Sequence, residues 1–132
     1  VGASVRFSNA RPHKEGYRRF RIENVTGQDD FAMIGEIVRR RYAKGDVPDL
    51  VVIDGGKGQL AAAVGALAGI GLSNLPCISL AKENEEIYVL GEQEPILLSR
   101  RSLALRMLQH ARDEAHRFGL AYNRRLRKVT PP

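Results

Sequence analysis

The segment at residues 50–60, LVVIDGGKGQL, constrains the fold of this chain more than any other part of it. A run of apolar residues, three of them β-branched, is typical of a short buried strand. The strand ends on a carboxylate, Asp54, and a glycine-rich turn carrying Lys57 leads into an alanine-rich helix. In α/β folds, ligands and metals gather at the carboxyl ends of strands. Asp54 is therefore a candidate functional residue.

Composition favours one globular domain. The 132 residues are 43% hydrophobic and 27% charged, and they suffice for a domain with its own core. No apolar run approaches the ~20 residues of a membrane span, and no signal peptide is visible. The single cysteine, Cys77, excludes an internal disulfide and lies among apolar neighbours. We expect a packed core thiol in a cytoplasmic protein.

The net charge of +6 favours a polyanionic partner. Any one basic cluster could be a solvated helix end, but four clusters rich in arginine favour phosphate, which guanidinium binds through two hydrogen bonds. Nucleic acid, bound without specific base reading, is the leading partner. The clusters are Arg18, Arg19 and Arg21; Arg39, Arg40 and Arg41; Arg100, Arg101 and Arg106; and Arg124, Arg125, Arg127 and Lys128.

The pattern of apolar residues and breakers predicts a mixed α/β sheet flanked by helices. The expected strands span residues 3–7 and 17–22 as an antiparallel hairpin, 50–54, 76–81, and a short hairpin of 86–90 with 95–98. The expected helices span residues 31–42 (capped by Asp29 or Asp30), 59–70 and 102–122. In the last helix, Leu103, Leu105, Met107, Leu108 and Ala115 are expected on or near one apolar face. A basic, loose tail is expected at residues 123–132.

The last expected helix carries the run RDEAHRF at residues 112–118. Arg112 and His116 are four positions apart and share a helix face. A histidine alone could be packed or solvated, but beside Asp54 it could help to hold a divalent cation or move a proton. Asp113 and Glu114 could supplement such a site, whereas Asp29 and Asp30 are better explained as a helix cap.

Two phosphate-binding motifs are excluded by spacing. A P-loop requires GxxxxGK followed by Ser or Thr, but Lys57 is followed by Gly58 and Gln59. A Rossmann fingerprint requires GxGxxG, which is absent. Without a further motif, Lys57 could bind phosphate, orient water or be solvated.

Four segments in order resemble the C-terminal endonuclease domain of UvrC, the nuclease subunit of bacterial-type nucleotide excision repair. They are YRRFRI at 17–22, DDFAMIGEIVRRRY at 29–42, PDLVVIDGGKGQL at 48–60 and RDEAHRF at 112–118. The resemblance spans nearly the whole chain, and IDGGKGQL combined with RDEAHRF is its most specific part.

The resemblance implies an RNase H-like domain over residues 1–122 and a Mg²⁺- or Mn²⁺-dependent cut of damaged double-stranded DNA, 5′ to the lesion. The implied protein partner is a UvrB-type subunit, and no membrane is involved. Similar proteins use an Asp, Asp, His set, in which Asp54 matches the second aspartate and His116 the histidine. The first belongs to a DxSH segment on the first, central strand. No DxSH occurs here, so that strand is expected to be missing from the chain.

The resemblance also suggests roles for other residues. Lys57, Arg112, Arg18 and Arg40 are expected to position the DNA backbone, and Gly55, Gly56 and Glu114 to support the site. Two alternatives remain open. One is a noncatalytic DNA-binding or assembly module with the same scaffold, and the other is an RNase H-like nuclease acting on RNA or recombination intermediates.

Overall fold

The computed structural model describes residues 2–9, 11–20, 30–82 and 84–129. Near the N-terminus, β1 (Gly2–Ser4) pairs antiparallel with β4 (Arg18–Phe20), which confirms the predicted antiparallel pairing, while residues 21–22 of the second predicted strand lie outside the described residues. The stretch between them is more ordered than the predicted turn. It holds a second antiparallel pair, β2 (Phe7–Ser8) with β3 (Arg11–Pro12), and a single 3-10 turn at Lys14–Gly16.

A three-stranded sheet of β5 (Val51–Asp54), β6 (Cys77–Ala81) and β7 (Glu86–Val89) forms the second group of strands. The β5 and β6 strands run parallel, and β7 pairs antiparallel with β6, so the sheet is mixed as predicted. The second half of the predicted final hairpin is reduced to one bridge between Ile87 and Ile96.

The first two helices pack against each other and build the larger core. They are α1 (Asp30–Tyr42) and α2 (Lys57–Gly69), close to the predicted ranges. Ala66 of α2 lies opposite Gly35 of α1, where a Cβ would be 4.0 Å from the Ala66 Cβ, so two small residues allow close approach at this interface. Cys77 is buried in the same core, and burial raises the pKa of its thiol to about 11, as expected of a core cysteine. The core residues are Val38, Val51, Leu60, Ala63, Ala66, Leu67 and Cys77.

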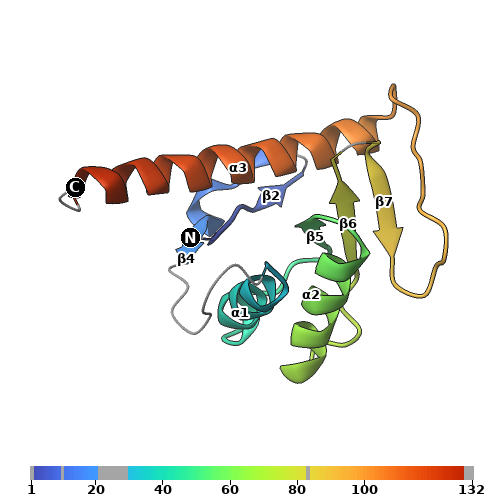
Figure 1. Ribbon diagram of the computed structural model, residues 1–132, viewed down its shortest axis with the longest axis horizontal. Helices are drawn as coiled ribbons and strands as arrows, with labels where there is room; N and C mark the ends of the chain where they lie inside the picture. Colours follow the sequence, from blue (N-terminus) through green and yellow to red (C-terminus); the bar gives the residue numbers. More distant parts are fainter. Residues whose placement is uncertain (1, 10, 21–29, 83, 130–132) are drawn as a thin grey trace.

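The longest element, α3 (Leu103–Val129), runs along one side of the molecule (Figure 1). The sheet lies beneath its N-terminal part, and β6 points its carboxyl end towards α3. The helix continues beyond residue 122, so most of the segment predicted to be a loose tail is helical. Within the described part of the chain, no helix is both long and apolar enough to cross a membrane.

The apolar residues of α3 do not share one face, which corrects the prediction. Leu105 and Leu108 are 1% and 6% exposed and pack against Leu80 and Ile87 of the sheet. Leu103 and Met107 are 80% and 39% exposed. Since successive helical residues are about 100° apart, the pairs 103/107 and 105/108 lie on roughly opposite sides of the helix.

Candidate functional site

Asp54 ends β5 and its side chain is exposed. The turn after it depends on Gly55, whose φ is +148° and whose N–H donates to the Leu80 carbonyl over 3.0 Å. A Cβ at Gly55 would lie 2.6 Å from Cγ of Gln59. Only glycine meets both conditions without strain. This turn therefore fixes the direction of the backbone after Asp54.

The next residue, Gly56, forms the N-cap of α2. Its N–H donates to the Gln59 side chain over 3.0 Å, and its carbonyl accepts from the buried Ser79 hydroxyl over 3.3 Å. Gly55 and Gly56 thus support the carboxyl edge of the sheet next to Asp54.

Lys57 is the first residue of α2, two positions before the predicted helix start. Its ammonium donates to the Gln93 carbonyl over 2.8 Å and lies 5.7 Å from the centroid of the Tyr88 ring. The side chain therefore contacts β7 and the loop that follows it.

A pocket of about 330 Å³ lies between α3 and the residues that follow β6. As predicted, Arg112 and His116 share a helix face: both line this pocket, together with Asp113 and Lys82. Asp54 is not among its lining residues. The structure therefore brings together only part of the predicted site.

Arg112 is held by two carboxylates. Its guanidinium donates to Glu85 over 2.8 Å and to Asp113 over 3.3 Å, and its side chain is 14% exposed. Burial alone would lower the pKa of Arg112, but the hydrogen bonds and charges of Glu85 and Asp113 outweigh it and raise the pKa. The guanidinium consequently ties α3 to the β6–β7 turn.

Glu114, which was predicted to support the site, is not among the residues that line the pocket. It is two residues from Arg112, which corresponds to about 200° around the helix. The Tyr17 hydroxyl donates to it over 2.6 Å, and Arg117 donates over 2.5 and 3.0 Å. The hydrogen bond from Arg117 is the main reason that the pKa of Glu114 is lowered to about 2.

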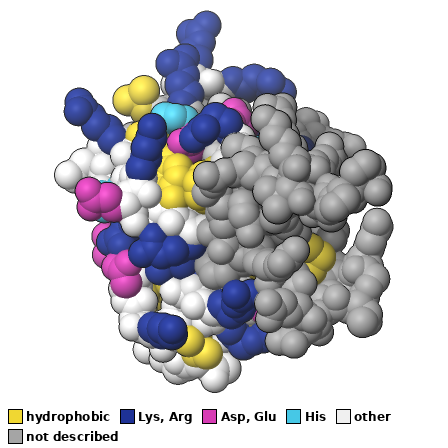
Figure 2. Space-filling model, turned by 90° about the vertical axis from the view of Figure 1, so that its left-hand side faces the viewer, with side chains coloured by type: hydrophobic (Ala, Val, Ile, Leu, Met, Phe, Trp, Pro, Cys, Tyr) yellow, Lys and Arg dark blue, Asp and Glu magenta, His cyan; other side chains and the backbone are white. Residues whose placement is uncertain are grey.

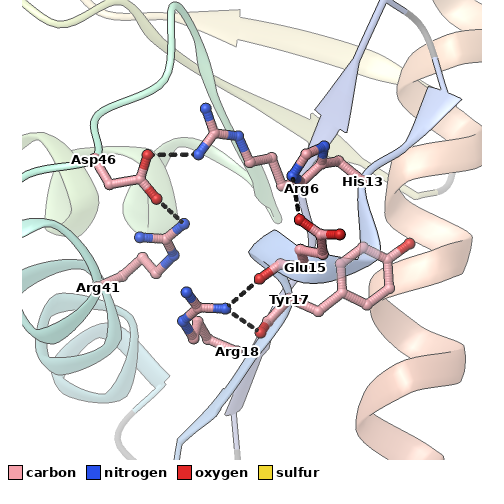
Figure 3. Close-up of polar contacts among 7 residues, drawn as sticks. All are labelled: Arg6, His13, Glu15, Tyr17, Arg18, Arg41 and Asp46. Atoms are coloured by element: carbon pink, nitrogen blue, oxygen red, sulfur yellow. Dashed lines mark hydrogen bonds and ion pairs between the residues drawn. The ribbon is translucent and has the colours of Figure 1, made fainter.

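The predicted DNA-binding residues Arg18 and Arg40 lie outside the pocket. Arg18 donates to the carbonyls of Glu15 and Tyr17, each over 2.8 Å (Figure 3). Arg40 lies 3.9 Å from the carboxylate of Glu36 on α1.

Asp46 links the N-terminal strands to the connection between α1 and β5. Arg6 donates to one carboxylate oxygen over 2.6 Å, and Arg41 to the other over 3.5 Å (Figure 3). Arg6 is the main reason that the pKa of Asp46 is lowered. Figure 2 shows Lys and Arg side chains on several parts of the described surface, with acidic side chains among them.

The predicted site residues supply some of the ligand atoms that a hard divalent cation prefers. The exposed carboxylate of Asp54 is an oxygen ligand of the kind that Mg²⁺ prefers, and Mg²⁺ commonly takes one or two carboxylates and completes its shell with water. Among the described residues, no group of three His, Cys, Asp or Glu side chains is placed to hold a metal ion. Asp54 therefore offers one ligand to such a cation, whereas His116 lines a pocket whose lining residues do not include Asp54.

Sequence reasoning missed Lys82 and Glu85. The sequence did contain a signal for Lys82. Asp54 ends β5, and Lys82 directly follows β6, the parallel neighbour of β5. Because the carboxyl ends of adjacent parallel strands share an edge of the sheet, both residues are expected at that edge. Glu85 carried no such signal. It lies in a turn at φ 54°, and its partner Arg112 is 27 residues away.

Comparison with known proteins identifies the family. The model of the UvrC RNase H endonuclease domain matches residues 1–120. The UvrABC system protein C of Methanosarcina barkeri is 50% identical over 97% of this chain and 25% of that protein. The proteins of the same name from Synechococcus and Gemmatimonas aurantiaca are 49% and 48% identical over 98% and 96% of the chain, and over 22% and 21% of their own lengths.

The chain thus spans about a quarter of the length of the curated relatives it matches. The mixed α/β architecture agrees with the match, and the predicted RNase H-like fold is confirmed. The chain belongs to the family of UvrC RNase H endonuclease domains.

Proposed function

We propose that this chain is the catalytic domain of an excision repair nuclease that cuts damaged DNA 5′ to the lesion. The observation that carries the proposal is the position of His116 in a pocket beside the carboxyl end of β6, the parallel neighbour of the strand that ends on Asp54. Membership of the UvrC RNase H endonuclease family supports the reaction class. The proposed partners are damaged double-stranded DNA and a UvrB-type subunit.

Asp54 would hold Mg²⁺ or Mn²⁺, and His116 would serve as a further ligand or as a general acid–base group. A bound divalent cation supplies charge stabilisation for the phosphoryl oxygens. Gly55 and Gly56 position Asp54 through the turn described above. Lys57, Arg18 and Arg40 would position the DNA backbone, whereas Arg112, whose guanidinium is paired with Glu85 and Asp113, would hold the wall of the pocket that His116 lines.

The proposal can be tested with a chimaera. In this protein, the chain replaces the matching quarter of the Methanosarcina barkeri protein. Asp54→Asn should abolish 5′ incision of lesion-containing DNA by the reconstituted UvrABC system while leaving DNA affinity nearly unchanged. The matched control is Asp49→Asn, which removes the same charge from an exposed residue just before β5. Undiminished 5′ cutting by the Asp54→Asn chimaera would contradict the assignment.

A second candidate function, a noncatalytic DNA-binding or assembly module, is favoured by one observation: the pocket that His116 lines does not include Asp54. Calorimetric titration with Mg²⁺ and Mn²⁺ separates the two candidates. Metal binding by the chimaera that is lost with Asp54→Asn supports the nuclease. A chimaera that binds DNA but neither binds metal nor cuts supports the noncatalytic module.

A further inference from the structure

The pocket beside α3 is lined by positively and negatively charged side chains. Its two cationic side chains differ in whether their charge is already paired with a carboxylate. Lys82 and Arg112 contribute positive charge, and Asp113 contributes negative charge. Arg112 lies between the carboxylates of Glu85 and Asp113, at 2.8 and 3.3 Å. Because two carboxylates surround this largely buried guanidinium, its charge is already compensated.

Lys82 differs from Arg112 in each of these respects. Its side chain is exposed, and within the described part of the chain no hydrogen bond or ion pair is found for its ammonium group. A lysine that lines a pocket and has no partner among the described residues can bind an anion from solution.

The position of Lys82 relates this cation to the proposed site. Asp54 is paired with Leu80, and Lys82 follows two residues later, or about 7 Å further along at ~3.3 Å per residue. Lys82 therefore lies beyond the sheet edge at which Asp54 ends, and it shares the pocket with His116.

We propose that this pocket is a subsite for one backbone phosphate of DNA and that Lys82 is the residue that contacts it. Arg112 then belongs to the wall of the subsite, where it holds the β6–β7 turn against α3. The volume of about 330 Å³ lies at the lower end of the range for ligand pockets, enough for a phosphate with part of its sugar. The inference rests on the proposed function in taking DNA as the ligand.

The test is the salt dependence of DNA binding by this chain, measured by fluorescence anisotropy with a short fluorescein-labelled duplex in EDTA. Replacing a lysine that neutralises one phosphate should reduce the slope of log K against log salt by about 1. Lys82→Gln should therefore weaken binding and reduce the slope by that amount between about 50 and 200 mM salt.

The matched control is Lys44→Gln, which makes the same change in net charge at an exposed lysine in the connection between α1 and β5. This variant should keep the slope of the unmodified chain. Equal slopes for all three proteins would overturn the proposal, and so would an equal reduction in both variants, because net charge alone would then govern binding. No binding of the duplex at the lowest salt would also overturn it.

A third variant separates the roles of the two cations. Arg112→Gln should lower the melting temperature, since it leaves Glu85 and Asp113 without their shared partner, but the slope should stay within a few tenths of that of the unmodified chain. A reduced slope for Arg112→Gln with an unchanged slope for Lys82→Gln would assign the phosphate to Arg112 and overturn the proposal. Because EDTA removes divalent cations, these outcomes are independent of whether Asp54 supports incision.

Discussion

The Tyr17 hydroxyl donates a 2.6 Å hydrogen bond to Glu114, joining two residues that are 97 positions apart in the chain. The Tyr17 ring also packs edge to face against Phe118, with ring centroids 5.0 Å apart. A similar edge contact joins Phe7 to His110 at 4.9 Å. These three contacts attach the N-terminal strands to the face of α3 that points away from the pocket.

Removing the Tyr17 hydroxyl should destabilise the domain. Hydrogen bonds to charged groups contribute about 1.5 to 3 kcal/mol, so we expect Tyr17→Phe to lower the free energy of unfolding in urea by an amount in that range. The control is Tyr88→Phe, because the Tyr88 hydroxyl bonds to Glu86 within the same strand over 3.0 Å. That change should stay within about 0.5 kcal/mol. Equal losses in both variants would contradict the proposed attachment.

The Tyr17–Glu114 pair should make stability depend on pH at both ends of the range. The folded-state pKa of Glu114 is lowered to about 2, chiefly by Arg117, so its contribution is present above the ordinary carboxyl pKa and is lost as pH falls towards 2. The pKa of Tyr17 is raised to about 12, first by burial and then by the bond to Glu114. Its contribution is present below about pH 10 and is lost as pH rises towards 12.

Urea unfolding over a series of pH values checks this prediction. Glu114→Gln should flatten the acid side of the stability profile, because glutamine does not titrate. An acid limb equally steep in the variant and the unmodified chain would show that other carboxylates carry the effect.

The glycine turn after Asp54 should tolerate no side chain. Gly55→Ala forces a residue with a Cβ into φ +148° and against Gln59, and such backbone strain costs about 1 to 3 kcal/mol. Gly65→Ala, in open space within α2, should instead raise stability by about 0.5 to 1 kcal/mol. Thermal melts of the two variants should therefore shift in opposite directions, and shifts of the same sign would contradict the strain argument.

Two leucines on α3 should respond very differently to truncation. Leu105 is almost fully buried against the sheet, so Leu105→Ala should cost about 2 to 5 kcal/mol. Leu103 projects into solvent two residues earlier, and Leu103→Ala should change stability by no more than about 0.5 kcal/mol. Comparable losses, measured by urea unfolding, would mean that α3 does not present opposite faces to the sheet and to solvent.

The part of the fold that sequence predicted best is the unit from β5 to α2, because all its signals are local. A β-branched run, a glycine pair and an alanine-rich stretch each restrict their own residues. The faces of α3 were not predictable in this way. Leu103, Leu105, Met107 and Leu108 are equally apolar, and only tertiary packing selects which of them is buried.

The candidate site, too, was predictable only where its signals are local. The shared face of Arg112 and His116 follows from their spacing of four, and the structure places both in one pocket. Their neighbours Glu85 and Lys82 belong to a turn that is distant in the sequence. Glu114 accepts a hydrogen bond from Tyr17 on the other side of the helix. Spacing within a helix defines faces, but it does not reveal which distant element each face meets.

The contacts on opposite faces of α3 also restrict how the site can move. Leu105, Leu108 and Arg112 hold one face to the sheet and the β6–β7 turn, while His110 and Glu114 hold the other to the N-terminal strands. Rotating the helix by one residue, about 100°, would break both sets of contacts at once. The orientation of His116 about the helix axis is thereby locked, and its imidazole can be re-aimed only through its own side-chain torsions.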